Sequence, residues 1–430
     1  MKKCWVLLMA LALVFSGAFV QAGQVKSNEP IELTYWSNYG HAPDIVRAFG
    51  TTGTRLLRAN GYPNATVKSE IIPYEGFEQK YLSAFASGKG PDTFLAMAAS
   101  YASDGGLNPV AAQLPDDVAK LWDSKLAPYL ASWGTYKGKR YGFTIEGIIQ
   151  FLFINVDHFK EAKLDPDKPP RTVDEFVAAA KQLTKYDSSG KIVRAGYMPR
   201  YLGHGLGVAD KFLPIVHIFG GRMLSPDLKK AEGYINSPES VAAFQFYHDL
   251  VYKHKVVNLD FGMPEAAFQR GMASMIFREG WLAADTMKKA PNIHFKVYPY
   301  IAGAKNYAPS NLLTWANLIN GNSKYKEVAF DLFRLMATVE ADVEMHKPAL
   351  FPPVLTETYS MSNEYFASLP FSHALQESLK KAVGPEYIHP KIESIAYIVG
   401  EELAACVKGT PAKQAADKAA KRIDETLASF

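Results

Sequence analysis

The stretch at residues 137–157 has the sequence KGKRYGFTIEGIIQFLFINVD. After a basic turn it consists almost entirely of apolar and β-branched residues, which is typical of a buried strand, and Gly142 and Gly147 are positions where such a strand can bend. A carboxylate in an apolar strand is costly unless it is paired or used, so Glu146 requires an explanation. We interpret the stretch as a crossover between two lobes, with Glu146 at the cleft. An ordinary core strand, with Glu146 at its solvent-exposed end, is the alternative.

The N-terminus has the pattern of a secretory signal peptide. Lys2 and Lys3 precede an apolar run over residues 5–20, and small residues at the cleavage positions lead up to Ala22. This predicts a signal peptide at residues 1–22, which is short for a membrane-spanning helix. No cysteine follows the run as a lipoprotein signal requires, so we expect a soluble periplasmic protein.

The composition of the chain excludes some partners. Removal of residues 1–22 takes away two of the 47 basic residues and none of the 43 acidic ones, which leaves a net charge of +2. Nucleic-acid binding normally requires a concentrated basic surface, so we expect no nucleic acid as the main partner. Of the two cysteines only Cys406 remains, which excludes an intrachain disulfide and predicts a small buried apolar side chain. The length predicts two domains.

Strands and helices alternate in the first part of the chain. Residues 31–36 alternate between apolar and polar positions, as a strand does, and residues 43–60 have a helical pattern. A second strand is expected at residues 66–73 and a third at residues 92–97, with an intervening helix that places three aromatic residues on one face. This order predicts an α/β domain with a largely parallel sheet.

The second half shows the same alternation with clear helix starts. Thr172 and Glu175 have the spacing of a capping box, and Pro238 follows Ser237 as the first residue of another helix. Residues 295–300 are expected to form a strand that returns the chain to the first lobe. The consecutive prolines at residues 352–353 fix an extended path, which suits a third crossing between lobes.

Four stretches, taken in order, resemble motifs of the family 1 extracellular solute-binding proteins. Residues 81–92 resemble the family's helix, Gly-x-x-Pro-Asp turn and strand. Residues 137–157 resemble its Asn/Lys-Gly-Lys … Tyr-Asn-x-Asp crossover, and residues 169–176 its Pro-Pro-x-Thr-Trp-x-Glu-Phe motif. Residues 267–281 resemble its Phe-x-x-Gly-x-x-Ala-Met … Gly-x-Trp element. The departures are Thr144 where proline often stands, Ile154 in place of tyrosine and Val173 in place of tryptophan.

This resemblance implies the two-lobed α/β fold of type II periplasmic binding proteins, with a ligand cleft between lobes joined by crossover segments. It also implies the solute-binding component of an ABC importer, a monomer that captures a sugar or oligosaccharide by hinge closure and delivers it to the membrane permease. Such a protein is not an enzyme. We expect the lobes to be discontinuous, with crossings near Thr144, Val297 and Phe351. The expected ranges are 31–143 with 300–348 for the N-terminal lobe, and 147–296 with 352–430 for the C-terminal lobe.

Motifs of catalysis and cofactor binding are incomplete in the sequence. Residues 203–207 lack the third glycine of a dinucleotide-binding motif, and residues 134–140 depart from a phosphate-binding loop in spacing and in the final residue. His248 and His254 lie six residues apart, on different helical faces, so we expect no metal and no cofactor. A carboxylate pair such as Glu146 and Glu279 keeps a secreted glycosidase open as an alternative.

Sugars combine apolar faces with hydroxyl groups, so we expect a site of aromatic side chains, carboxylates and amides at strand ends. Trp281 is the strongest candidate, because it stands where members of the resembled family often place a stacking tryptophan. Core packing is the alternative for every aromatic candidate. The candidate ligand-binding residues are Trp36, Asn38, Tyr74, Glu75, Phe94, Glu146, Arg278, Glu279, Trp281, Trp315 and Phe351.

The charge of the ligand stays open at this point. Arg278, Arg200 or His204 would hold an acidic solute, such as a uronide or a sugar phosphate, in place of a neutral sugar. Arg278 and Glu279 would equally pair with other charged side chains and leave the ligand to the aromatic residues.

Overall fold

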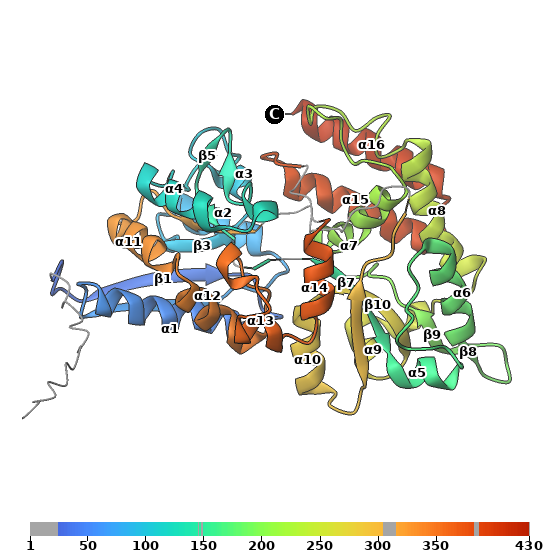
Figure 1. Cartoon of the computed structure of the whole chain (residues 1–430). Helices are drawn as coiled ribbons and strands as arrows, with labels where there is room; N and C mark the ends of the chain where they lie inside the picture. The colour runs from blue at the N-terminus through green and yellow to red at the C-terminus, as the bar shows by residue number, and fades with distance from the viewer. Residues whose placement is uncertain (1–24, 145, 148, 304–314, 382–386, 430) are drawn as a thin grey trace, which may run out of the picture.

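The computed structural model describes residues 25–144, 146–147, 149–303, 315–381 and 387–429. The signal peptide expected at residues 1–22 lies outside them. The described elements gather around two five-stranded sheets, which we take as the centres of the first and the second lobe (Figure 1). No helix among the described ranges is long and apolar enough to cross a membrane.

The first sheet has the strand order β2-β1-β3-β12-β6. β1 pairs in parallel with β2 and β3, whereas β12 runs antiparallel to both β3 and β6. In this sheet β2, β1, β3 and β6 therefore run in one direction and β12 runs against them, which agrees with the expected largely parallel sheet. The strands are β1 (Ile31–Ser37), β2 (Ala65–Ile71), β3 (Thr93–Ala96), β6 (Gly142–Phe143) and β12 (Ala316–Ile319), and a separate hairpin joins β4 (Thr135–Tyr136) to β5 (Lys139–Arg140).

Helices from distant parts of the chain cover this sheet. In Figure 1 the orange α11 and α12 lie beside the blue α1, with which both are in contact. The core is aromatic, and the ring of Tyr35 stacks on that of Phe49 at 3.9 Å between centroids. The helices of this lobe are α1 (Pro43–Ala59), α2 (Phe77–Ala86), α3 (Ala98–Tyr101), α4 (Asp116–Lys125), α11 (Lys326–Met336) and α12 (Val339–His346).

The second sheet has the order β11-β7-β10-β9-β8. Only the pairing of β10 with β9 is parallel, so this sheet is mixed. All six residues of β7 are buried, which confirms the buried strand expected within residues 137–157. The strands are β7 (Gln150–Asn155), β8 (Lys185–Tyr186), β9 (Ile192–Tyr197), β10 (Ala273–Glu279) and β11 (Phe295–Pro299).

The helices of the second lobe begin as the sequence predicts. Thr172 and Glu175 form the capping box of α6, and Ser237 caps α8 with Pro238 as its first residue. Cys406 is buried on α15, where burial raises the pKa of its thiol to about 12. The helices are α5 (Val156–Glu161), α6 (Val173–Leu183), α7 (Gly205–Ile218), α8 (Pro238–Tyr252), α9 (Pro264–Gln269), α10 (Trp281–Lys289), α14 (Ser372–Leu379), α15 (Ile392–Val407) and α16 (Ala412–Ala428), while the short α13 (Glu364–Ser368) lies beside α12 of the first lobe (Figure 1).

The crossings between the sheets differ in detail from the expected ones. The first falls between β6 and β7, around Thr144. The second comes after Val297, because β11 belongs to the second sheet and Ala302 still bridges to Thr172. The third comes after Phe351, because Leu355 bridges to Leu126 of the first lobe. These backbone bridges shift two of the expected boundaries by a few residues, and the division of the sequence into two discontinuous lobes stays our proposal.

Candidate ligand-binding site

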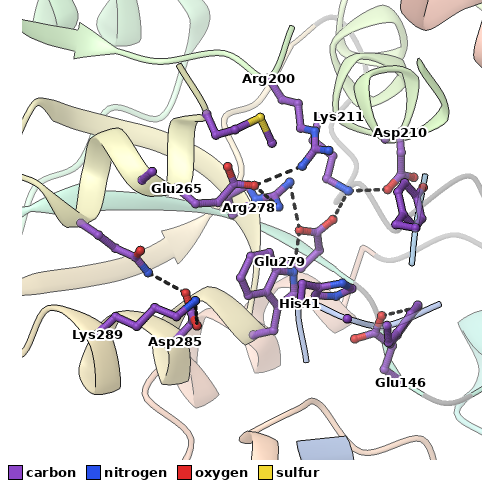
Figure 2. A pocket seen from close by; sticks show the side chains of 18 of the residues that line it. His41, Glu146, Arg200, Asp210, Lys211, Glu265, Arg278, Glu279, Asp285 and Lys289 are labelled. Atoms are coloured by element: carbon purple, nitrogen blue, oxygen red, sulfur yellow. Dashed lines mark hydrogen bonds and ion pairs between the residues drawn. The ribbon is translucent and has the colours of Figure 1, made fainter. Parts of the chain in front are cut away.

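A cavity of about 540 Å³ is lined by both lobes and by the first crossing. Its volume lies in the range of roughly 300–1,000 Å³ that is common for small-molecule sites. Figure 2 shows its charged side chains converging from several elements. The lining residues are Tyr39, Gly40, His41, Tyr74, Glu146, Arg200, Gly207, Asp210, Lys211, Met263, Glu265, Ala266, Gln269, Arg278, Glu279, Trp281, Asp285, Lys289 and Trp315.

Strand ends place many of these side chains at the cavity. Tyr39 and His41 lie in the loop that follows β1. Arg278 and Glu279 are the last residues of β10, and Trp281 opens α10 directly after them. Of these residues, Arg278, Glu279 and Trp281 were candidates from the sequence, because ligands of α/β proteins commonly lie at the carboxyl ends of strands, whereas Tyr39 and His41 were not.

Two arginines share one carboxylate on the wall formed by the second lobe. Glu265 forms ion pairs with Arg278 and, at 3.2 Å, with Arg200 (Figure 2). Arg278 also lies 3.6 Å from Glu279. All these side chains are buried or nearly so, and a charge removed from water needs such pairing.

Lys211 lies between Asp210 and Glu279 and forms an ion pair with each, at 2.6 Å in the case of Asp210. Burial by itself raises the pKa of Glu279, but the neighbouring Lys211 and Arg278 outweigh it and hold this pKa below its usual value. Trp281 adds a hydrogen bond, because its Nε1 donates to Glu279 at 3.1 Å. Glu279 is therefore an ionised carboxylate with its partners already in place.

Glu146 has a different environment at the crossing. It is buried, and Tyr39 donates a hydrogen bond from its hydroxyl to Oε1 at 2.7 Å. Burial raises the pKa of Glu146 well above its usual value, although the hydrogen bond from Tyr39 opposes this. The carboxyl group therefore favours its neutral, protonated form and offers both a donor and an acceptor to the cavity.

Aromatic rings form the remaining walls. The Trp281 ring lies 5.0 Å from the His41 ring, and the Arg278 guanidinium lies 4.9 Å from the Trp281 centroid. His41 is itself an exposed residue at the edge of the cavity. On the first lobe, Trp315 lies 6.4 Å from Tyr74 between ring centroids.

Several buried polar atoms at the cavity have no hydrogen-bond partner within the described residues. The donors among them are Nε of Arg200 and both Nε and Nη1 of Arg278, and the acceptor is Oε2 of Glu265. Buried polar groups are almost always hydrogen-bonded, so the wall around these atoms has hydrogen-bonding capacity that the described residues leave unused. A hydroxyl group, which both donates and accepts, matches a wall that presents both kinds of atom.

The structure brings together about half of the candidate residues. Those that line the cavity are Tyr74, Glu146, Arg278, Glu279, Trp281 and Trp315. Phe351 lies instead in an adjoining groove, which it shares with His41 and Trp281. Asn38 is buried away from the cavity, and Glu75 is exposed.

Two aromatic candidates pack within the first lobe and do not line the cavity, Phe94 in its core and Trp36 partly buried against that core. Phe94 has no exposed surface and packs against Phe85 and Tyr101. Trp36 is its neighbour in the register of β1 and β3, and its ring contacts that of Tyr81. Both predictions were wrong because their strands direct these side chains toward the aromatic face of α2, and not toward the cleft.

Sequence analysis missed the charged residues that α7 and α9 contribute. Asp210 and Lys211 lie within α7, which is otherwise almost entirely apolar, and Glu265 lies in the first turn of α9. A charged pair inside an apolar helix was the available signal. The remaining missed residues are Tyr39, His41, Gln269, Asp285 and Lys289.

The three residues considered for an acidic solute all have ion-pair partners in the structure. Arg200 and Arg278 pair with Glu265, and His204 lies 3.5 Å from Glu78 of the first lobe. A search of the described residues for groups of three or more potential metal ligands found none.

Comparisons with known proteins identify the family. The family model described as bacterial extracellular solute-binding protein matches residues 57–368. The sn-glycerol-3-phosphate-binding periplasmic protein UgpB of Yersinia pseudotuberculosis serotype I is 26% identical over 396 residues, which cover 84% of this chain and 86% of that one. The same protein of Brucella abortus strain 2308 is 24% identical over 342 residues, with coverages of 76% and 77%.

Solved structures confirm the two-lobed α/β fold. The cyclic α-maltosyl-1,6-maltose binding protein from Arthrobacter globiformis superposes with a TM-score of 0.74 at 20% identity, covering 94% of this chain and all of that one. A solute-binding protein of an ABC transporter from Thermotoga lettingae, bound to α-D-tagatose, gives a TM-score of 0.76 at 21% identity, with coverages of 92% and 100%. With a family model that matches most of its length, this chain belongs to the bacterial extracellular solute-binding proteins.

Proposed function

We propose that the protein binds a neutral saccharide or a related polyol in the cavity between its lobes and delivers it to the permease of an ABC importer. The observation that supports this most is the wall where the guanidinium groups of Arg200 and Arg278 adjoin the carboxylate of Glu265, with atoms of all three lacking a hydrogen bond within the described residues. Neighbouring hydroxyl groups of a sugar satisfy donors and acceptors at once.

The aromatic lining fits the same class of ligand. Trp281 and Trp315 present apolar surface from different lobes, against which the C–H faces of a sugar ring would pack. Proteins of the same fold have been crystallised with tagatose and with maltose, which supports the proposal without identifying the sugar.

An acidic solute is the second candidate, and the names of the sn-glycerol-3-phosphate-binding relatives favour it. The local charges oppose an acidic solute, because Glu265 already forms ion pairs with Arg200 and Arg278, the two arginines that would bind a phosphate or carboxylate. The relatives are also distant, at 24% and 26% identity. We therefore place the neutral ligand first.

Transport would follow from closure of the lobes. A ligand that contacts Trp315 on one lobe and Trp281 on the other stabilises the closed state more than the open one. Export to the periplasm by removal of residues 1–22, a monomeric state, and action without a metal or cofactor complete the proposal. The family consists of binding proteins, so we favour binding over the glycosidase alternative.

The test uses protein without residues 1–22, kept in a chelator and screened by thermal shift against neutral sugars, polyols, glucuronate and sn-glycerol 3-phosphate. A neutral ligand should raise the melting temperature, since a hundredfold excess over Kd stabilises the folded state by about 2.7 kcal/mol. The protein is also incubated with an oligosaccharide. Recovery of this oligosaccharide intact would support binding, and shortened products would support hydrolysis. A response confined to the two acidic compounds would overturn the proposal.

A further inference from the structure

Glu265 occupies a central position among the charges of the cavity. It lies in the first turn of α9 and bridges two guanidinium groups that come from different segments, Arg200 after β9 and Arg278 at the end of β10 (Figure 2). Its side chain is 13% exposed, and Oε2 has no hydrogen-bond partner within the described residues.

The state of Glu265 follows from its surroundings. Burial raises its pKa, but Arg278 and Arg200 outweigh this effect and hold the pKa below its usual value. Glu265 is therefore ionised at neutral pH, and its charge compensates the part of the wall that would otherwise attract anions. The other basic groups nearby are compensated as well, since Lys211 pairs with Asp210 and Glu279.

We propose that Glu265 is a specificity-determining residue that excludes phosphate- and carboxylate-bearing solutes from the cavity. The inference rests on the proposed function and adds to it the chemical class that the site rejects. A protein separates two ligand classes either through contacts to one or through repulsion of the other. Glu265 does both.

The Glu265 carboxylate places a negative charge at the wall of the cavity, and its side chain is 13% exposed. A neutral hydroxyl that reaches this carboxylate donates a hydrogen bond to it, which is among the stronger kinds. A phosphate or carboxylate at the same place has no proton to donate and brings a second negative charge close to the first. Repulsion between like charges is much stronger in a buried site than in water.

A different role for Glu265 would be purely structural. In that case it would hold Arg200 and Arg278 in place so that they receive an anion, as the names of the distant relatives would suggest. The two roles predict opposite results when the charge of Glu265 is removed without a change in shape.

The experiment compares wild type, Glu265→Gln and Glu239→Gln by calorimetry. Glu239 is an exposed residue of α8 in the same lobe, so its variant is a matched control for the loss of one negative charge. The probes are inorganic phosphate, sn-glycerol 3-phosphate and, as its uncharged counterpart, glycerol. Circular dichroism checks that each variant is folded.

Glu265→Gln should bind the two phosphate probes at least tenfold more tightly than wild type and the control. Adding Arg200→Gln to this variant should reverse the gain, because one of the released guanidinium groups is then lost. Phosphate binding by wild type that Glu265→Gln leaves unchanged or weakens would overturn the inference. A folded variant without any gain would also overturn it.

If Glu265→Gln fails to fold, the wild-type protein still tests the inference. A large excess of phosphate should neither stabilise the protein nor displace a bound neutral ligand, and either effect would overturn the inference. Gain of phosphate binding in Glu265→Gln, combined with no response of wild type to any neutral sugar or polyol, would support Glu265 as the excluding residue and overturn the saccharide proposal alone.

Discussion

Trp281 connects the aromatic and the charged sides of the cavity. Its ring packs against His41 and Arg278, and its Nε1 donates a hydrogen bond to Glu279. It is 8% exposed, so its side chain contributes to packing as well as to the wall of the cavity.

Trp281→Ala should weaken ligand binding by about ten- to hundredfold, since the lost apolar area is worth roughly 1.5–3 kcal/mol and each 1.4 kcal/mol is a factor of ten. Trp281→Phe should lose less, because it keeps a ring and removes the donor to Glu279. Calorimetry measures both, and Trp36→Phe is the control away from the cavity. Unchanged affinity with a stability loss of about 3–5 kcal/mol would instead mark Trp281 as a core residue.

At the scale of single residues, sequence reasoning located the aromatic residues that follow strand ends, such as Trp281 and Trp315. It missed Glu265 because the partners of this residue lie far along the chain, 65 residues away in the case of Arg200. Ion pairs of this kind leave no spacing pattern. Phe94 was misassigned because the sequence does not show whether a side chain at the end of a strand points into the core or into the cleft.

Among the elements, β6 shows how closely the crossing segment approaches the first sheet. A Cβ atom on Gly142 would collide with the backbone carbonyl of Asn317 on β12, with which β6 is paired. The absence of a side chain is therefore a requirement of the sheet at this point.

Gly142→Ala should lower the free energy of unfolding by about 1–3 kcal/mol, the usual cost of overpacking, because a backbone atom cannot move aside as a side chain can. Urea denaturation measures this. Gly40→Ala is the comparison, since its Cβ would meet Ile71 at an ordinary 3.5 Å. Equal stabilities of the two variants would show that β6 and β12 separate readily.

The starts and faces of elements were predictable because caps and periodicity are local. Thr172 with Glu175, and Ser237 with Pro238, lie where the sequence placed them. The parallel direction of β1, β2 and β3 was predictable from the alternation of strands and helices, whereas the antiparallel direction of β12 was not, because it pairs with a strand from a distant part of the chain.

Across the whole molecule, the two lobes also meet outside the cavity. Near the start of α15, Glu393 is buried close to Glu78 of the first lobe, which in turn faces His204. Burial, together with the Glu78 charge, raises the pKa of Glu393 to about 8, although a hydrogen bond from the backbone of Met97 opposes this.

Stability should therefore fall as the pH rises. The pKa of Glu393 is 4.5 when the residue is exposed and about 8 in the structure. Its contribution to the stability of the folded state is therefore complete below pH 4.5 and is lost as the pH rises through about 8. The melting temperature should decrease between pH 5 and about 8. Glu393→Gln should flatten this profile and raise the melting temperature at pH 8. An unchanged profile in the variant would assign the effect to other groups.

The two-lobed fold was predictable from the order of motifs along the chain, since each motif keeps its place in the family. The lobe boundaries were less so, because Ala302 and Leu355 remain attached to a lobe through single bridges that no local pattern encodes.

The buried thiol of Cys406 has a practical consequence. Without residues 1–22 it is the only cysteine, and its inaccessibility protects it from alkylating dyes. If Met287, which is 52% exposed, is replaced by cysteine, that new cysteine would be the single site labelled by a fluorophore. Met287 shares a groove with Asp44 of the opposite lobe, so the emission of that dye would follow the approach of the lobes in real time.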